Sequence, residues 1–318
     1  MEQSTQKIVN KKSKGQRFGE YIAKNRQLII MVVPGVIMLI LFKLAPLLGM
    51  IIAFQDYSPF SGILGSQFVG VKYFEKMIHD PYMPKLVVNT VVLAFETLIF
   101  SFPVPIIFSL LVNEIRLKSI KDSVQSFSFL PYFISSAVMV SIVYTMLSPS
   151  SGIVNEIIKF FGGKPISFMS NPHWFRPIYI ILQIWQTFGY SSIIYMASMA
   201  SIDMSVYESA DIDGAGRWKK MWYITLPAIK PTIITMLIIS VGNIFTVDLD
   251  RILLMYNQSV YETADVLQTY VYRLGFASSG FPEYSYGTAV NLVKSVIAFL
   301  LVTLTNNIAD KYADSRLF

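Results

Sequence analysis

Residues that could do covalent or metal chemistry are scarce in this sequence. It contains no cysteine and only two histidines, which lie 94 positions apart, so thiolate nucleophiles and Cys/His metal clusters are not expected. A phosphate loop needs Gly, four residues and then Gly-Lys-Ser/Thr. The nearest candidate, Gly163-Lys164, is followed by Pro165 and has Ile158 at the first glycine position. We therefore expect no metal, no cofactor, no ATP site and no enzymatic activity in the chain itself.

Noncovalent chemistry is left to polar side chains that lie inside apolar runs. Gln183, Gln186 and Tyr190 recur at i, i+3 and i+7 on one helix face, with Trp185 nearby. Polar groups in such runs are costly without a role and mark transport paths. The other candidates for a polar path are Glu96, Tyr144, Asn243, Asp250 and Lys294. Interhelical hydrogen bonding is the structural alternative for each.

Two of these candidates carry opposite charges. Glu96 and Lys294 could form a structural ion pair between two spans, or Lys294 could balance the charge of an acidic ligand. Lys43 lies far along its apolar run, so we expect it to extend toward the membrane interface. The sequence leaves the choice for Lys294 open.

The elements that must position these residues are membrane spans. The chain is 53% hydrophobic and only 14% charged, against about 25% charged residues in a soluble domain. A bilayer-spanning helix needs about 20 apolar residues. Six stretches qualify: Leu28–Phe54, Leu86–Asn113, Val124–Leu147, Pro177–Ala200, Thr232–Leu254 and Thr288–Ala309.

The positive charge is distributed as a topology signal. Of the 26 Lys and Arg residues, 16 lie in the leader, in the loops 114–123 and 201–230, and at the C-terminus, whereas eight are assigned to the other side, with Arg251 counted among them. The positive-inside rule then places both termini in the cytoplasm. This gives a basic leader 1–27, a six-span domain 28–309 and a tail 310–318. Because the charge lies between apolar spans, the net +6 does not indicate nucleic-acid binding.

Three longer loops then face outward: Gln55–Lys85, Ser148–Arg176 and Met255–Gly287. In the second of them Ile153, Ile157 and Phe160 share one helix face. This spacing predicts a short amphipathic helix at the membrane surface.

The cytoplasmic loop 203–231 has the pattern of two short helices around a turn. Ser205 is a candidate N-cap with Glu208 three residues later, which fits a capping box. Gly214 and Gly216 supply a permissive backbone for a sharp turn. Such a projecting amphipathic element must either fold under its own bundle or enter a groove on a partner.

This loop resembles the coupling loop of ATP-binding-cassette importer permeases. The family pattern is Glu-Ala-Ala, two residues, Asp-Gly-Ala, and then an aromatic residue, Ile and Leu-Pro at fixed spacing. The matching positions are Glu208, Ala210, Asp213, Gly214, Ala215, Ile224, Leu226 and Pro227. Ser209 replaces the second alanine, and Met221 stands where phenylalanine is usual. Trp218 belongs to the helix that would follow the turn.

Three outward segments resemble permeases of complex-oligosaccharide importers, the group related to the LplB-type polysaccharide permease. They read FKLAPLLGMIIAFQDYSPFSGILGSQFVGVKYF, GIVNEIIKFFGGKPISFMSNPHWFRP and LLMYNQSVYETADVLQTYVYRLGF. The resemblance implies an all-α integral membrane protein with six transmembrane helices in the type I importer architecture. It also implies location in a bacterial plasma membrane and an oligosaccharide substrate, which could contain uronate.

The resemblance further implies the partners. They are a second, non-identical permease, two cytoplasmic ATPases that bind ATP and Mg, an extracellular solute-binding protein, and membrane lipid. Glu208 and Asp213 would contact the ATPase, and charge reversal at Glu208 or a bulky residue at Gly214 would abolish transport. Two other classes stay open: a secondary transporter or channel built on Glu96, and a sensor or scaffold subunit.

Overall fold

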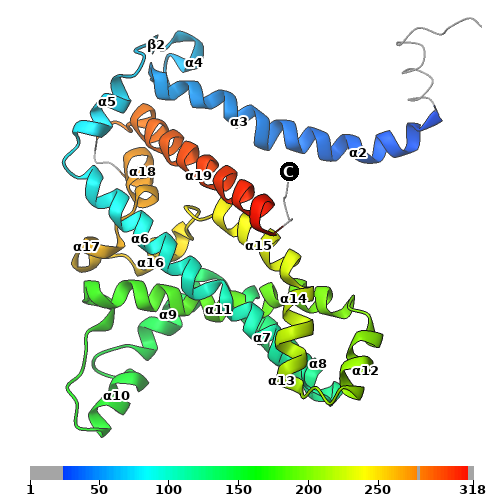
Figure 1. Ribbon diagram of the computed structural model, residues 1–318. Coiled ribbons are helices and arrows are strands. Elements are labelled where there is room, and N and C mark those ends of the chain that lie inside the picture. The colour runs from blue at the N-terminus through cyan, green and yellow to red at the C-terminus, as the bar shows by residue number, and fades with distance from the viewer. Residues whose placement is uncertain (1–23, 278–279, 314–318) are drawn as a thin grey trace, which may run out of the picture.

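The computed structural model describes residues 24–277 and 280–313, which are predominantly helical (Figure 1). Most of the leader 1–27 and the end of the tail 310–318 lie outside the described residues. The helices of the predicted spans are α2 (Arg26–Leu39), α3 (Ala45–Leu48), α6 (Met83–Ser101), α7 (Pro103–Asn113), α8 (Lys118–Phe129), α9 (Ser136–Met146), α11 (Pro172–Ala200), α15 (Lys230–Gly242), α16 (Leu249–Met255) and α19 (Tyr284–Ala313).

The connecting segments hold short elements. They are β1 (Gln55–Asp56), α4 (Gly62–Gly65), β2 (Gln67–Phe68), α5 (Lys72–His79), α10 (Ile153–Phe160), α12 (Met204–Ile212), α13 (Arg217–Lys220), α14 (Leu226–Ala228), α17 (Tyr261–Ala264) and α18 (Leu267–Phe276). The strands β1 and β2 pair antiparallel, with Gln55 opposite Phe68.

Helices long and apolar enough to cross a membrane occur in most of the predicted places. In the described part of the chain three helices meet both criteria: Arg26–Phe54, Met83–Asn113 and Tyr284–Lys311. Two bent pairs bring the number to five if each pair is one span. The predicted fourth span is α11, which has 29 residues. Polar side chains along its inner face lower its mean hydropathy. The last helix, α19, runs through residue 313, beyond the predicted boundary at 309.

The third and fifth spans are broken, which corrects the continuous helices predicted for 124–147 and 232–254. Lys118–Phe133 and Ser136–Met146 meet at 98°, after Pro131 in a 3-10 turn at Leu130–Phe133. In the fifth span α15 ends at Gly242, and residues 243–248 are irregular before α16 begins. Irregular backbone at membrane depth is tolerated where protein or a water-filled cavity surrounds it. These breaks therefore point to a cavity beside them.

Two π-helical turns precede prolines in the same register. One covers Ile40–Leu44 and ends two residues before Pro46, and the other covers Met221–Thr225 and ends two residues before Pro227. A proline ring clashes with the carbonyl four residues earlier in an α-helix. That carbonyl belongs to the π-turn in both cases, and widening the helix there lets it continue past the proline.

The helix α11 is the centre of the bundle. It packs against α6, α7, α8 and α17, and it supplies Phe175, Tyr179 and Leu182 to the largest core cluster. α19 forms a second centre, because it packs against α5, α15, α18 and the end of the first span. The two groups are joined by α6, which contacts both α11 and α18.

A close backbone approach fixes α11 against the preceding span. A Cβ atom added at Gly189 would lie 2.0 Å from the carbonyl oxygen of Ser128. Only glycine permits α11 to come this near to the end of α8.

A buried carboxylate organises the outer loops. Asp265 is fully buried and accepts both guanidinium nitrogens of Arg273 at 2.7 Å. Its carboxylate also accepts from the hydroxyls of Tyr82 at 2.7 Å and Thr269 at 2.6 Å. Because Tyr82 immediately precedes α6 and Arg273 lies on α18, this cluster ties the last outer loop to the second span.

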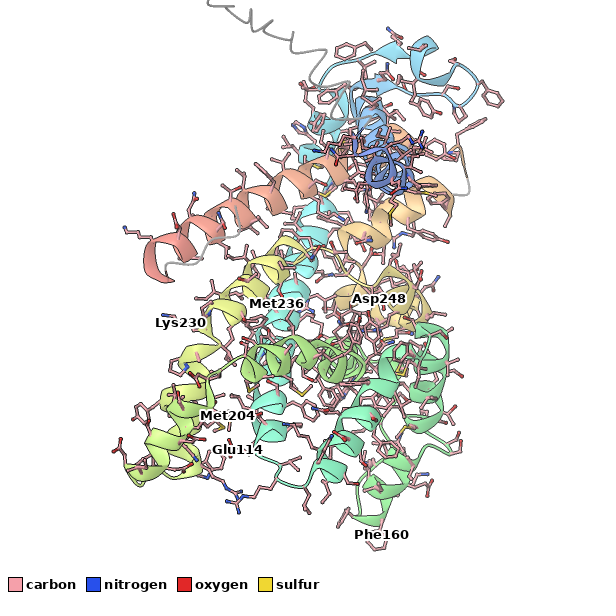
Figure 2. The ribbon with its side chains drawn as sticks, turned by 90° about the vertical axis from the view of Figure 1, so that its right-hand side faces the viewer. Glu114, Phe160, Met204, Lys230, Met236 and Asp248 are labelled. Carbon is pink, nitrogen blue, oxygen red and sulfur yellow. The ribbon has the colours of Figure 1, made fainter. Side chains whose placement is uncertain are left out.

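The predicted helix of the second outer loop is present as α10. Ile153, Ile157 and Phe160 are all exposed on it, and Phe160 marks its free end (Figure 2). Asn155 on the other face is buried and bonds the carbonyls of Leu147, Ser148 and Ile166. Contact of α10 with a membrane surface stays a prediction.

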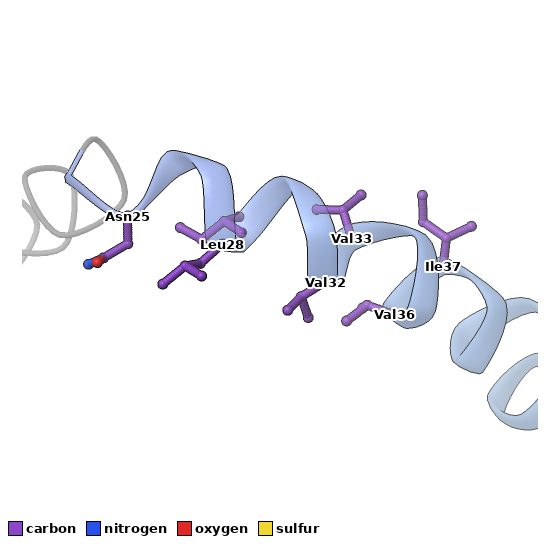
Figure 3. Close-up of a pocket in the computed structure, with 7 residues that line it drawn as sticks. Asn25, Leu28, Val32, Val33, Val36 and Ile37 are labelled. Atoms are coloured by element: carbon purple, nitrogen blue, oxygen red, sulfur yellow. The ribbon is translucent and has the colours of Figure 1, made fainter.

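The first span is set apart from the bundle. None of the residues of α2 or α3 is buried, whereas its last turn, Gly49–Phe54, packs against α19. Figure 3 shows Leu28, Val32, Val33, Val36 and Ile37 projecting from α2. This helix thus offers a long apolar surface to lipid or to another helix.

Gly189→Ala should destabilise the protein, because the added methyl group would collide with the backbone of Ser128. Overpacking of this kind costs about 1 to 3 kcal/mol, and thermal unfolding in detergent would measure it. Gly35→Ala is the matched control, since no atom lies within 4 Å of a Cβ at Gly35. Equal melting temperatures for the two variants would contradict the close approach.

Asp265→Asn should lower stability by about 3 kcal/mol, because it leaves the Arg273 guanidinium without its counter-charge. The control is Asp56→Asn, which removes an exposed ion pair with Lys72 at 3.1 Å and should cost less than about 1 kcal/mol. Thermal unfolding of both variants tests the difference. A similar small loss in each would show that the buried cluster does not hold the outer loop.

Candidate functional site

The coupling loop, residues 203–231, begins with a capped helix. The cap of α12 is Asp203, whose carboxylate accepts from the backbone amide of Ser205 at 2.9 Å. This corrects the prediction that Ser205 is the N-cap, because the cap lies two residues earlier and the helix begins at Met204. Hydrogen bonds from the amide and hydroxyl of Ser205 hold the pKa of Asp203 below its usual value.

The turn after α12 depends on Gly214. Its φ is +72°, in the left-handed region that glycine occupies without steric cost. The amide of Ala215 donates to the carbonyl of Ala210 at 2.9 Å, and the amide of Gly214 donates to Asp211 at 3.1 Å. Lys220 also reaches back to the Asp211 carboxylate at 2.7 Å. Gly216 has φ of −67°, so only Gly214 of the two predicted glycines needs its special freedom.

The second half of the loop is anchored in the bundle. Met221 is buried in a cluster with Leu110, Tyr195, Met199 and Ile229. Tyr207 of α12 shares a hydrogen bond of 2.8 Å with Thr225. Ile224 and Leu226 are half-buried, and Pro227 follows in α14. The loop is therefore a rigid extension of the fifth span.

The face of the coupling loop that points away from the bundle is apolar and exposed. Ile212 is 87% exposed, Trp218 67% and Tyr223 80%. Glu208 and Asp213 are also exposed, and neither has an ion-pair partner within the described ranges. Ser209 is exposed, and its hydroxyl bonds the carbonyl of Ser205. Apolar bulk beside free carboxylates is typical of a surface that a partner covers.

A polar cavity lies deeper in the bundle, beside the two helix breaks. It has a volume of about 540 Å³ and is bounded by α6, α7, α11, α15, the irregular segment 243–248 and Tyr132 from the bend of the third span. The hydroxyls of Thr97 and Ser101 face it without a hydrogen-bond partner in the described structure. The expectation that the breaks accompany a cavity is thus met.

Arg251 connects the segments around this cavity. Its guanidinium donates to the side-chain oxygens of Gln183 and Gln186 on α11 and forms an ion pair of 3.0 Å with Asp248. Asp248 caps α16 by accepting from the amide of Arg251 at 3.0 Å, and it accepts from Ser136 of α9 at 3.1 Å. Figure 2 shows Asp248 well away from Met204 and Lys230, which lie in the coupling loop.

Three predicted path residues line the cavity: Gln183, Gln186 and Asn243. Tyr190 stacks on Tyr132 with ring centroids 3.9 Å apart, so it supports the cavity wall from behind. Gln186 also donates to the carbonyl of Ile134 at 2.8 Å, which satisfies backbone freed by the bend. Their contact with a substrate stays a prediction.

The other predicted path residues lie away from this cavity. Tyr144 and Trp185 are partly exposed on other helix faces, and Asp250 points outward from the first turn of α16. Glu96 lines a separate groove with Arg176, and Lys294 lines another with Phe299. Because they occupy different grooves and no ion pair joins them in the described part of the chain, the suggested Glu96–Lys294 pair is not formed.

Three residues around the cavity were not predicted from the sequence: Arg251, Asp248 and Tyr179. Arg251 was counted among the outward charges, although it lies inside the predicted fifth span. An arginine within a span is itself a signal for a functional site. The sequence gives no comparable indication for Tyr179, because its place under the Arg251 guanidinium depends on the fold.

Residues 82–314 match the model of the family described as "Binding-protein-dependent transport system inner membrane component". This covers more than half of the chain. The chain belongs to this family. It is therefore an inner-membrane permease, as the coupling-loop and outer-loop motifs predicted, and its architecture is that of the type I permeases.

Two curated relatives come from Bacillus subtilis. The permease is 40% identical to the polygalacturonan/rhamnogalacturonan transport system permease protein YteP, over 98% of this chain and 96% of that protein. It is 38% identical to protein LplB, over 96% of this chain and 95% of that protein. The predicted relation to the LplB-type group is confirmed.

Two solved structures share the fold. A bacterial ABC transporter involved in import of the acidic polysaccharide alginate has a TM-score of 0.85 and 36% identity, over 93% of the permease and 99% of that chain. A bacterial alginate ABC transporter in complex with an alginate pentasaccharide-bound periplasmic protein has a TM-score of 0.86 and 35% identity, over 95% and 100% of the two chains.

Gly214→Val should distort the turn of the coupling loop, because a β-branched residue in the left-handed region costs about 1 to 2 kcal/mol. Gly214→Asn is the control, since asparagine tolerates this conformation. Tryptic cleavage after Arg217 and Lys219 should be faster in the valine variant than in the asparagine variant. Equal cleavage would mean that the loop does not need the left-handed residue.

Proposed function

We propose that this permease is the membrane subunit of an ATP-driven importer of acidic, uronate-containing oligosaccharides. The supporting observation is the exposed coupling loop, a rigid surface of apolar side chains and free carboxylates that continues from the fifth span. Relatives that share nearly the whole chain transport polygalacturonan/rhamnogalacturonan or alginate, and these names support an acidic sugar.

ATP is hydrolysed by separate cytoplasmic subunits that cover the coupling loop. Glu208 and Asp213 then bond the partner, while Trp218 and Tyr223 enter an apolar groove, as in helix-in-groove recognition. ATP and Mg belong to those subunits, because the sequence has no phosphate loop. The permease contributes the path and the coupling surface, and it is not itself an enzyme.

A second, non-identical permease completes the path. The cavity of about 540 Å³ is only partly enclosed by this chain, and a facing subunit would enclose a sugar in it. The apolar surface of α2, which its own bundle leaves uncovered (Figure 3), supports a helix partner for the first span. Movement of the two halves against each other would provide alternating access.

The positions of the ends and loops support the predicted orientation. In Figure 1 the beginning of α2, the end of α19 and the coupling loop lie toward the right, and β2, α5, α10 and α17 lie toward the left. Together with the excess of Lys and Arg, this supports cytoplasmic termini in a bacterial plasma membrane. The outer loops then receive a sugar-loaded binding protein.

The cavity offers groups that suit sugars. The free hydroxyls of Thr97 and Ser101 and the amide of Asn243 can bond sugar hydroxyls, and Tyr132 presents a ring. Glu96 lies in a different groove, which argues against a secondary transporter that uses this carboxylate for an ion at the same cavity.

Glu208→Lys should reduce sugar uptake at least tenfold in proteoliposomes that contain the full importer, because it places a positive charge in the coupling surface. The chain should still insert and copurify with the second permease. Asp122→Lys, at an exposed position of α8, is the matched charge reversal and should retain uptake. Undiminished uptake by Glu208→Lys would overturn coupling through this loop, and uptake without any ATPase subunit would indicate a secondary transporter.

A further inference from the structure

One of the side chains that line the polar cavity is an arginine that is almost hidden from solvent. Arg251 is 2% exposed, and it and Asp248 are the charged residues that line the cavity in the described structure. A buried arginine at membrane depth is expensive and indicates a role. Its bonding pattern shows which role is available.

The partners of Arg251 differ in how firmly they are engaged. The Asp248 carboxylate is held in place by three contacts: the guanidinium, the amide of Arg251 and the hydroxyl of Ser136. Gln183 and Gln186 instead offer neutral amide oxygens. The Nε atom of Arg251 has no partner in the described structure. Arg251 thus combines one fixed ion pair with neutral acceptors and a spare donor.

A carboxylate can replace such neutral acceptors. Guanidinium binds a carboxylate through two parallel hydrogen bonds, and both partners are then ionised, so the attraction of opposite charges adds to the hydrogen bonds that the neutral amide oxygens also provide. Because water is largely excluded around Arg251, the advantage of a charged over a neutral acceptor grows. A sugar hydroxyl has no such advantage over a glutamine amide.

We propose that Arg251 binds the carboxylate of the acidic sugar, which displaces the side chains of Gln183 and Gln186 from the guanidinium. The inference rests on the proposed uptake of acidic oligosaccharides, and it identifies the residue that distinguishes them from neutral ones. The released glutamine amides are then free to bond the sugar's hydroxyls.

The exchange acts on the helix bend as well. Gln186 donates to the carbonyl of Ile134 at 2.8 Å while it accepts from Arg251. Ile134 lies where the third span turns by 98°. Substrate binding therefore alters the contact between α11 and this bend, which gives the occupied cavity a direct mechanical link to the third span.

The test uses the full importer in proteoliposomes, with saturating binding protein. Trigalacturonate and its methyl ester are the probes, and the rates of uptake and of ATP hydrolysis are measured. Arg251→Gln should raise the KM for trigalacturonate about 10- to 100-fold, as expected for loss of a hydrogen bond to a charged group. The KM for the ester should change less than about threefold, and Arg251→Lys should be intermediate. Lys118→Gln, an exposed substitution at the start of α8, is the charge control.

Gln183 supplies a second test that does not depend on the ester. Gln183→Glu gives Arg251 a permanent carboxylate partner that competes with the sugar. Gln183→Leu removes the acceptor at this position and leaves that side of the guanidinium available to the sugar. If the sugar carboxylate competes with residue 183 for Arg251, trigalacturonate uptake falls more in Gln183→Glu than in Gln183→Leu, although Gln183→Glu has the higher melting temperature. A merely structural role for Arg251 predicts the opposite order of uptake.

The outcomes separate the inference from the proposed function. If the wild type takes up neither sugar, the proposed function fails and the inference fails with it. If Arg251→Gln loses both sugars equally, or neither, the importer stands and the assignment of Arg251 is wrong. A selective loss of the acidic sugar, together with the stronger effect of Gln183→Glu, supports the assignment.

Discussion

The contacts of the Arg251 guanidinium are the interaction that holds the broken spans of this permease together. It joins the unbroken helix α11 to the start of α16, and through Asp248 and Ser136 it reaches α9 beyond the bend of the third span. Broken helices expose amides and carbonyls that lipid cannot satisfy. The polar side chains around Arg251 satisfy them, and this allows two spans to be interrupted at the same depth.

The opposite ends of the bundle follow a common pattern, in which a local cluster fixes each loop to a span. At one end, Asp265 and Arg273 bind the last long loop to the beginning of α6. At the other end, Met221 and the Tyr207–Thr225 hydrogen bond hold the loop 203–231 to the fifth span. A displacement of either loop is therefore passed to a transmembrane helix.

The sequence predicts the features that depend on local pattern. Apolar length located the first, second and sixth spans, the Glu208 to Pro227 motif located the coupling loop, and the two permissive glycines located the turn, which the structure has at Gly214. The breaks in the third and fifth spans could not be predicted, because tertiary hydrogen bonds to Ile134 and Asp248 stabilise them. For the same reason the i, i+3 spacing found Gln183 and Gln186 but gave no hint that Arg251 binds both. Glu96 and Lys294 had suitable charges, yet which groove each helix face meets is decided by packing.

The first span is too long for the bilayer. Its 29 helical residues extend about 44 Å at the helical rise, whereas the hydrocarbon core is about 30 Å thick. Mismatch of this size is relieved by a steep tilt. The last turn of the span, Gly49–Phe54, packs against α19, whereas α2 lies apart from the other helices of the bundle (Figure 1). Bilayer thickness thus becomes a variable that sets how widely the subunit reaches.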